Sequence, residues 1–320
     1  MSDVAHTRLF RGAPRAKRPP PLRLTFARHT IASDLHPERN EDALLIDRQR
    51  GLAAVFDGVG GSVAGEVAAR LAARVLRHGW KRLLDDWRAR GKARVPLNTS
   101  HDIGDVLDQL LRIAHEAVRR IELPNDPDDE RRQSGAESAA TTAALAVVYR
   151  LRGKRGQHVT GAWVGDSRVY RLRARGRLIR LTCDDGLLSR LVHDGVVSER
   201  DATRIDQASF AGELPDIDQS LFNRRNGITQ SLGGPHTPEV HLAHTTLLPG
   251  ERLLLCTDGI HDNLTDRELE ILLRRGARTT VARTIVAHAH ERSREDTFAA
   301  MRAKPDDMTA IVITCDRAPA

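Results

Sequence analysis

The chain has 320 residues, of which 40% are hydrophobic and 29% are charged, so one large or two small globular domains with a substantial core are expected. Its net charge of +7 invites comparison with nucleic-acid-binding proteins. However, the arginines are spread along every segment. Three Trp, two Tyr and six Phe provide few surfaces on which bases could stack. We therefore expect no nucleic-acid partner.

The three cysteines lie far apart, at positions 183, 256 and 315. This pattern argues against a disulfide framework and a zinc site, and it fits a reducing compartment. No run reaches 18 consecutive apolar residues, and the N-terminus lacks the apolar stretch of a secretory signal. We therefore expect a cytoplasmic protein without a membrane span. Residues 1–22, rich in Arg and Pro, are predicted to form a disordered basic tail.

From residue 23 the pattern becomes regular. Residues 22–30 alternate like a strand. Two short apolar runs, 43–47 and 52–57, flank Arg-Gln-Arg-Gly and predict a hairpin. Apolar residues then recur at helical spacing over 65–84 and again over 105–122, so two long helices are expected after the hairpin.

The second half begins with three strand-like runs, 141–151, 158–173 and 176–182, whose spacing predicts an antiparallel meander. Residues 186–232 have little periodicity and are interpreted as an excursion (a flap) over one end of the sheet, a type of loop that is often functional. The remaining expected elements are strands at 239–248, 250–259 and 308–315 and helices near 266–275 and 279–294. Strand–helix alternation is absent, so we predict an α+β fold in a single domain, 23–318.

One carboxylate raises a specific question, because Asp57-Gly58 ends a buried strand and is followed by a glycine-rich stretch. A hairpin turn, a phosphate-binding loop and a metal site all use such residues. Glu66 stands where a phosphate-binding loop requires lysine, and Val63 breaks the dinucleotide-binding pattern. A turn and a metal site remain as alternatives for this motif taken alone.

The motif is not alone, because acidic residues stand at five strand ends. These are Glu41 with Asp42, Asp57, Asp166, Asp258, and Asp306 with Asp307. If these ends converge, their charges repel strongly unless cations bind between them. Oxygen ligands without His or Cys at zinc-like spacing favour Mg²⁺ or Mn²⁺.

Two such cations activate a water molecule and hold phosphoryl oxygens, so hydrolysis of a phosphate ester is the natural reaction. The sequence contains neither a Cys-x5-Arg loop nor a Gly-x-Ser-x-Gly elbow, and a metal-activated water requires no nucleophilic side chain.

Six motifs carry a family resemblance: RNEDAL, VFDGVGG with AGE, TTAALAVV, WVGDSRVYRLR, LLLCTDGIHD and DDMTAIVI. In this order they resemble the metal-dependent Ser/Thr protein phosphatases of the type 2C family, and most of all its bacterial members. The resemblance spans about residues 25–315. It implies two antiparallel sheets packed face to face, flanked by pairs of helices, and two Mn²⁺ or Mg²⁺ ions with a weaker third.

The same resemblance implies roles for individual residues. Asp57 would bridge both metals, the Gly58 carbonyl would bind the second, and Asp258 and Asp307 would bind the first. Glu41 and Asp42 would hold metal-bound waters, with Asp42 also assisting proton transfer. Asp166 and Asp262 match the acidic pair that holds the third ion.

Four positions, in three of the motif regions, depart from the family pattern. Pro37 stands where an arginine usually contacts the substrate phosphate, and Arg39 is the expected substitute. Ala140 replaces the glycine of a Gly-Thr-Thr motif. Asp185 and Gly186 replace a His-Ser pair near the third-metal region and the flap, which bears on substrate choice and on third-metal affinity.

We therefore predict a phosphoserine/phosphothreonine protein phosphatase that acts on phosphorylated proteins opposite a Ser/Thr kinase, as a monomer. A second hypothesis is a scaffold or binding protein of the same fold with little turnover. A third is nucleic-acid binding through the basic tail, which predicts affinity that falls steeply with salt.

Overall fold

The computed structural model describes residues 22–59, 63–89, 99–121, 139–151, 156–296 and 301–317. Positions 1–21 of the predicted basic tail lie outside these ranges. Within the described ranges, no helix is both long and apolar enough to cross a bilayer.

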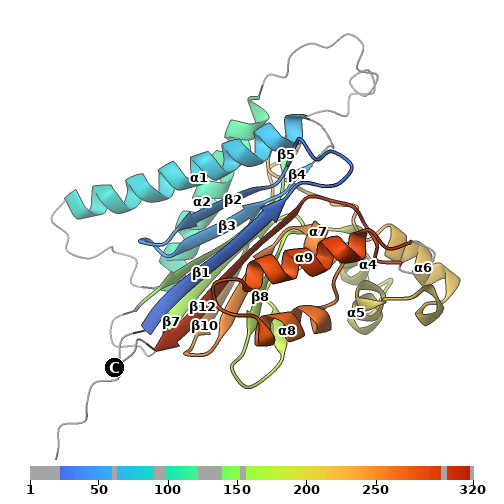
Figure 1. Ribbon diagram of the computed structural model, residues 1–320. Coiled ribbons are helices and arrows are strands. Elements are labelled where there is room, and N and C mark those ends of the chain that lie inside the picture. The colour runs from blue at the N-terminus through green and yellow to red at the C-terminus, as the bar shows by residue number, and fades with distance from the viewer. Residues whose placement is uncertain are drawn as a thin grey trace, which may run out of the picture.

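Two five-stranded antiparallel sheets form the centre of the molecule (Figure 1). The first has the order β1 (Leu22–Ile31), β12 (Met308–Arg317), β11 (Arg252–Cys256), β8 (Arg168–Leu172) and β9 (Leu178–Arg180). The second has the order β10 (His241–Leu247), β7 (Gln157–Val164), β6 (Ala143–Tyr149), β3 (Leu52–Phe56) and β2 (Ala43–Asp47). A short ladder pairs β4 (Gly58–Val59) with β5 (Ala140–Thr141). The predicted α+β fold with two antiparallel sheets is confirmed.

Strand alternation explains why the two sheets stack. In β3 the side chains of Ala53 and Val55 belong to the core between the sheets, together with Ile313 of β12. Leu52 and Phe56 of the same strand face the helices on the other side. Because all five residues of β3 are buried, the strand reads as a continuous apolar run rather than an alternating one.

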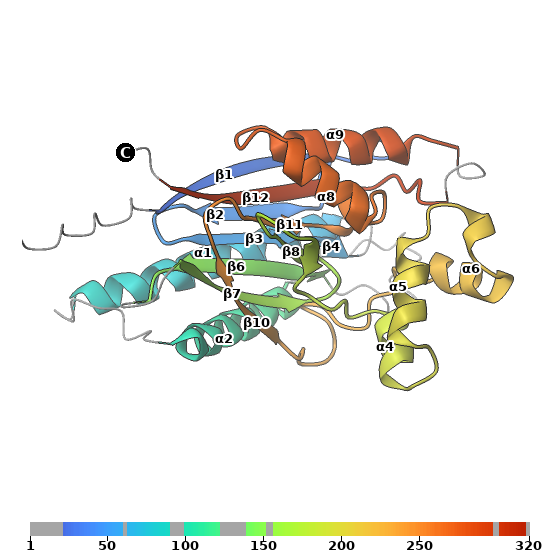
Figure 2. The same ribbon diagram turned by 90° about the horizontal axis from the view of Figure 1, so that it is seen from below.

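A pair of long helices covers the outer face of each sheet (Figures 1 and 2). On the second sheet these are α1 (Val63–Ala89) and α2 (Ser100–Arg119). On the first sheet they are α8 (Asp266–Arg275) and α9 (Val281–Ser293). Capping boxes begin α2 at Thr99 and α8 at Thr265.

The predicted meander is wrong at one point. The run 158–173 divides at Gly165 into β7 and β8, which belong to different sheets. Gly165 has φ +95°, and a Cβ there would lie 2.7 Å from Thr142 Cβ, so a residue with a side chain would be strained and crowded. This break places Asp166 at the junction of the two sheets.

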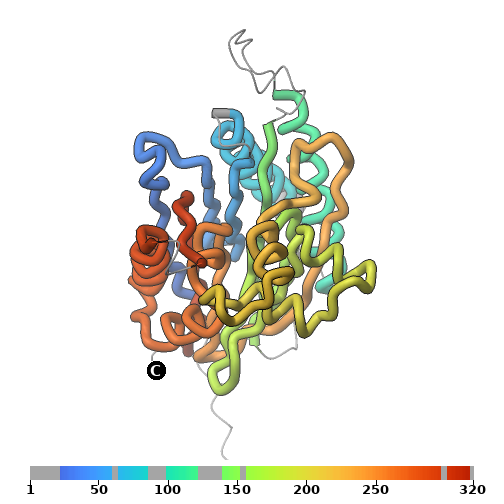
Figure 3. Tube along the Cα trace, turned by 90° about the vertical axis from the view of Figure 1, so that its right-hand side faces the viewer, coloured from blue at the N-terminus to red at the C-terminus, as the bar shows by residue number. Residues whose placement is uncertain are grey.

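The segment expected to lie over one end of the sheets contains three short helices and a 3₁₀ turn. They are α4 (Leu187–His193), α5 (Glu199–Gln207), η1 (Ala211–Glu213) and α6 (Asp216–Asn223). Ile205, Leu214 and Phe222 form a separate small core. Figure 2 shows this group beyond one end of the sheets, and Figure 3 views it from that side.

Candidate functional site

Acidic side chains from both sheets line one cleft of about 290 Å³. Asp57 follows β3, Asp166 lies between β7 and β8, and Asp258 follows β11 and opens the short helix α7 (Asp258–His261). Glu41 precedes β2, while Asp306 and Asp307 precede β12. The predicted convergence of carboxylates therefore occurs, and it occurs at the edge where the two sheets meet.

The backbone around Asp57 is fixed on both sides. Its N–H is held by Thr142 Oγ1 at 3.2 Å, and its carbonyl accepts bonds from Thr142 N–H and Thr141 Oγ1, both at 2.8 Å. Next to it, Gly58 has no room for a side chain, because a Cβ would lie 2.5 Å from the Gly65 backbone and 2.8 Å from the Glu41 carbonyl. The glycine thus permits the start of α1 to pack directly on the cleft.

Lys304 pairs with three acidic residues, two of which line the cleft. Its Nζ lies 2.6 Å from Asp258 Oδ2, 2.8 Å from Asp262 Oδ2 and 3.0 Å from Asp306 Oδ2. Asp258 and Asp262 are one helical turn apart, and Arg225 also pairs with Asp262 at 3.2 Å. Although burial raises the pKa of Asp262, the charges of Lys304 and Arg225 hold it well below its usual range.

Adjacent carboxylates before β12 have different surroundings. Asp307 accepts the backbone N–H of Ser33 on Oδ1 and that of Glu41 on Oδ2, both at 2.7 Å. Asp306 instead directs Oδ2 toward Lys304 in the cleft. Both Asp307 oxygens therefore accept main-chain donors, and the ligand role that the resemblance implied for Asp307 stays a prediction.

The predicted catalytic residues Asp42 and Arg39 are not among the residues that line the cleft, although both flank Glu41, which does. Asp42 is buried, and its Oδ2 accepts a bond from Thr257 Oγ1 at 2.8 Å, while Oδ1 has no hydrogen-bond partner. Arg39 pairs with Glu41 at 2.9 Å. His36 lines the cleft from the same loop as Glu41, and its Nδ1 lies 3.0 Å from the Arg39 carbonyl.

Burial and mutual repulsion raise the pKa of several carboxyl groups. The pKa of Asp57 and of Asp166 lies well above the usual value, first because of burial and then because of Asp258. Burial and Asp258 likewise raise the pKa of Asp306 to about 7. A set of acidic groups that retain protons so strongly favours the binding of cations.

The donor set fits hard cations such as Mg²⁺ or Mn²⁺. It consists of oxygens, and two buried carboxylate oxygens, Asp42 Oδ1 and Asp258 Oδ1, have no hydrogen-bond partner. In the part of the chain that the structure describes, however, no three His, Cys, Asp or Glu residues are already arranged as a metal-binding group. The ammonium group of Lys304 lies between three of the acids.

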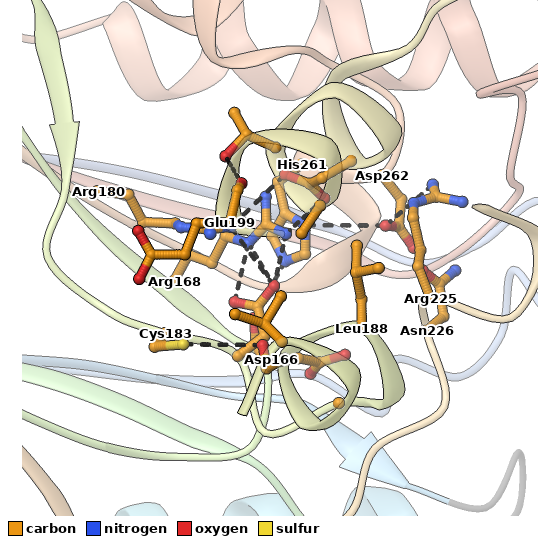
Figure 4. A pocket seen from close by; sticks show the side chains of 17 residues that line it. Asp166, Arg168, Arg180, Cys183, Leu188, Glu199, Arg225, Asn226, His261 and Asp262 are labelled. Carbon is orange, nitrogen blue, oxygen red and sulfur yellow. Dashed lines mark hydrogen bonds and ion pairs between the residues drawn. The ribbon is translucent and has the colours of Figure 1, made fainter. Parts of the chain in front are cut away.

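A second cavity of about 270 Å³ adjoins the cleft and shares Asp166 and Asn226 with it (Figure 4). Asp262 and His261 line its inner side, and α4 and α5 form the opposite wall. Both residues of the predicted third-metal pair therefore line this second cavity, and Asp166 lines the first cleft as well. Arg168 lies buried here between Asp184 at 2.6 Å and Asp206 at 2.8 Å.

Sequence reasoning missed several residues at the site. Lys304 stands two residues before the last motif and was not singled out, and Asp306 was named as a strand-end acid without being chosen over Asp307. Both adjacent acids line the cleft, and what distinguishes them, main-chain donors on Asp307 and Lys304 beside Asp306, is a set of tertiary contacts that the sequence does not encode. His36 and Asn226 carry no pattern that would have identified them.

Comparisons with known proteins agree with this geometry. A family model described as protein phosphatase 2C matches residues 36–304. The Ser/Thr protein phosphatase PstP of Mycobacterium tuberculosis is 27% identical over 230 residues, which cover 72% of this chain. The chain spans about a third (35%) of that relative's length.

Solved structures show the same fold. M. tuberculosis PstP has a TM-score of 0.62 at 23% identity, covering 91% of this chain and 98% of that one. The S. agalactiae Ser/Thr phosphatase has a TM-score of 0.64 at 18% identity, covering 91% and 99%. A PstP catalytic domain in complex with two manganese ions has a TM-score of 0.60 at 23% identity, covering 92% and 100%. Because the family model matches more than half of this chain, the chain belongs to the protein phosphatase 2C family.

Proposed function

We propose that this chain is a metal-dependent Ser/Thr protein phosphatase that hydrolyses phosphoserine and phosphothreonine esters. The observation that carries the proposal is the convergence of strand-end carboxylates from both sheets in one cleft. Family membership and the PstP structure with two manganese ions support the same reaction and the same class of cofactor.

In this proposal Asp57, the Gly58 carbonyl, Asp258 and Asp306 hold two Mn²⁺ or Mg²⁺ ions. When bound, two such ions supply an activated water and stabilise the phosphoryl oxygens. Both acids line the cleft. Asp306 replaces Asp307 in the predicted set because both Asp307 oxygens accept main-chain N–H groups and fix the loop that carries Glu41, whereas Asp306 Oδ2 contacts the ammonium group of Lys304. A third ion between Asp166 and Asp262 remains part of the proposal.

Other residues in and beside the cleft position the reactants. Glu41, kept in place by Arg39 and by the bond from its main-chain N–H to Asp307, would orient a water molecule in the cleft. Thr257 fixes Asp42 so that its Oδ1 is available to accept a proton. Pro37 stands where the family usually has the phosphate-binding arginine, and Arg39 and His36 are the basic side chains of the same loop that could contact the phosphate in its place.

The substrates that follow from this reaction are phosphorylated proteins, with a Ser/Thr kinase as the opposing enzyme. We further infer a monomer acting in the cytoplasm. The alternative of a scaffold without turnover is less well supported, because acids at every predicted metal-binding position are present and Asp57, Asp166, Asp258 and Asp306 line one cleft.

Hydrolysis of a phosphothreonine peptide tests the proposal directly. Turnover is expected with Mn²⁺ or Mg²⁺ and not with EDTA, and Asp57→Asn should reduce it at least about a hundredfold because one charged metal ligand would be lost. Asp85→Asn, a change of the same kind at the partly exposed end of α1, is the control. A folded protein without turnover in either metal would favour the scaffold.

A further inference from the structure

Lys304 occupies a position in which cations are expected to bind. Its Nζ lies within 3.0 Å of oxygens from Asp258, Asp262 and Asp306. Two of these acids, Asp258 and Asp306, belong to the proposed ligand set, and the third belongs to the proposed third-metal pair. The ammonium group therefore neutralises the same carboxylates that would bind a divalent ion.

The backbone of Lys304 is held in place, so this position is not that of a loose side chain on a loop. The buried Asn263 side chain donates to the Lys304 carbonyl at 2.8 Å and accepts from its N–H at 3.1 Å. Asn263 also donates to the Gly259 carbonyl of α7 at 2.9 Å. Pro305 follows and favours an extended conformation for Lys304. The segment is thus fastened to the short helix that carries Asp258.

We propose that Lys304 is an internal cation that competes with the metal ion bound by Asp258 and Asp306. In the metal-free protein its ammonium group takes the place of an ion and relieves the repulsion among the three acids. A divalent ion then has to displace it, and the displacement weakens metal binding. The inference rests on the proposed function, because it concerns the same metal site.

Coulomb's law gives the direction of the effect. A positive charge close to three carboxylates lowers the energy of the metal-free state, and it repels an incoming ion unless it moves away. Replacing Lys304 with a neutral residue removes both contributions. Metal affinity is then expected to rise, whereas the stability of the metal-free protein is expected to fall.

Calorimetric titration of Mn²⁺ into the full chain, stripped of metal with EDTA and dialysed, measures this competition without relying on activity. Lys304→Met and Lys304→Gln both remove the charge, and the glutamine retains a hydrogen-bond donor. Each is expected to bind Mn²⁺ at least tenfold more tightly than the wild type, which corresponds to about 1.4 kcal/mol. In EDTA both variants should have a lower melting temperature, and saturating Mn²⁺ should remove that difference.

Lys81→Met is the matched control, because Lys81 is exposed on α1 and the same charge is lost there. Its Mn²⁺ affinity should equal that of the wild type. Unchanged affinity in both folded Lys304 variants would overturn the inference and leave the metal site intact, even if their melting temperatures fall. Absence of Mn²⁺ binding by every protein in the series would overturn the proposed metal site itself, and the competition with it.

Discussion

At the scale of single residues, Asp306 and Asp307 show how neighbours in one motif acquire different tasks. Asp307 is buried and uses its two oxygens to hold the Ser33–Glu41 loop. Asp306 is partly exposed, faces Lys304 and has Asp258 as a source of repulsion. The first arrangement stabilises the fold, and the second leaves a carboxylate available to a cation.

Exchanging each of these acids for asparagine should separate the two tasks. Asp306→Asn is expected to weaken Mn²⁺ binding at least about tenfold with little loss of stability. Asp307→Asn is expected to cost about 1–3 kcal/mol, because its amide NH₂ would face a buried N–H donor. Titration calorimetry and urea denaturation measure the two effects. If Asp307→Asn abolished Mn²⁺ binding while stability stayed constant, Asp307 would be the ligand after all.

The raised pKa of Asp306 predicts a pH dependence of the metal-free protein. Because the pKa is about 7 when folded and about 4 when unfolded, the folded state retains a proton that the unfolded state releases. The stability that Asp306 contributes is therefore complete below about pH 4 and is lost as the pH rises through 7. Burial lowers the pKa of His261 from 6.5 to about 3, so its contribution to stability instead rises with pH between these two values.

A comparison with Asp306→Asn isolates this contribution, since the variant retains His261 but lacks the titrating acid. In EDTA the variant should become progressively more stable than the wild type between pH 5 and pH 8, as measured by urea denaturation. A constant difference over this range would show that Asp306 does not retain its proton.

At the scale of elements, Arg302 connects the flap to the cleft. Its fully buried guanidinium donates to the carbonyls of Asp206 at 2.6 Å and Ala208 at 3.0 Å, at the end of α5. It also donates to the His261 carbonyl of α7 at 2.7 Å. One side chain thus joins the small core of the flap to the helix that carries Asp258.

Arg302→Met should loosen this connection, because three buried carbonyl groups lose their donor. Amide hydrogen exchange in α5 is expected to accelerate at least about tenfold, while exchange in α1 should not change. Arg200→Met, at an exposed position of α5, is the control. Equal exchange in both variants would mean that the Ile205–Phe222 core holds the flap without help from Arg302.

Local signals determined how well each element was predicted. The helix near 266–275 agrees with α8 because Thr265 and Glu268 mark its start and the apolar spacing is regular. The short helices α4, α5 and α6 were not predicted individually, because each is too brief to show a period. The division of 158–173 depends on which sheet each half joins, and this is a tertiary property that the alternation of residues does not encode.

At the scale of the whole molecule, the layers were predictable and the final contacts were not. Acidic residues at the ends of apolar strands indicated one site, and the structure brings these acids together in one cleft. The choice between Asp306 and Asp307 and the position of Lys304 depend on where side chains point after the sheets have packed. Sequence patterns specify which faces are buried, but they do not specify such directions within a polar cleft.

The packing of the two sheets also predicts the cost of a cavity. Ile313 is completely buried between them, so Ile313→Ala should reduce the free energy of unfolding by about 2–5 kcal/mol. Ile271→Ala, on the outer side of α8 where the side chain is 39% exposed, should cost less than about 1 kcal/mol. Urea denaturation of both variants checks the difference, and equal losses would contradict the assignment of this core.

The bonds from Ser33 and Glu41 to Asp307 span 274 and 266 residues. During synthesis, the first acidic motif therefore leaves the ribosome long before the residue that fixes it. Until β12 enters the first sheet between β1 and β11, those strands lack their shared neighbour and the cleft lacks one wall. A nascent chain is thus expected to be inactive, and the last strand to be made both closes the fold and completes the site.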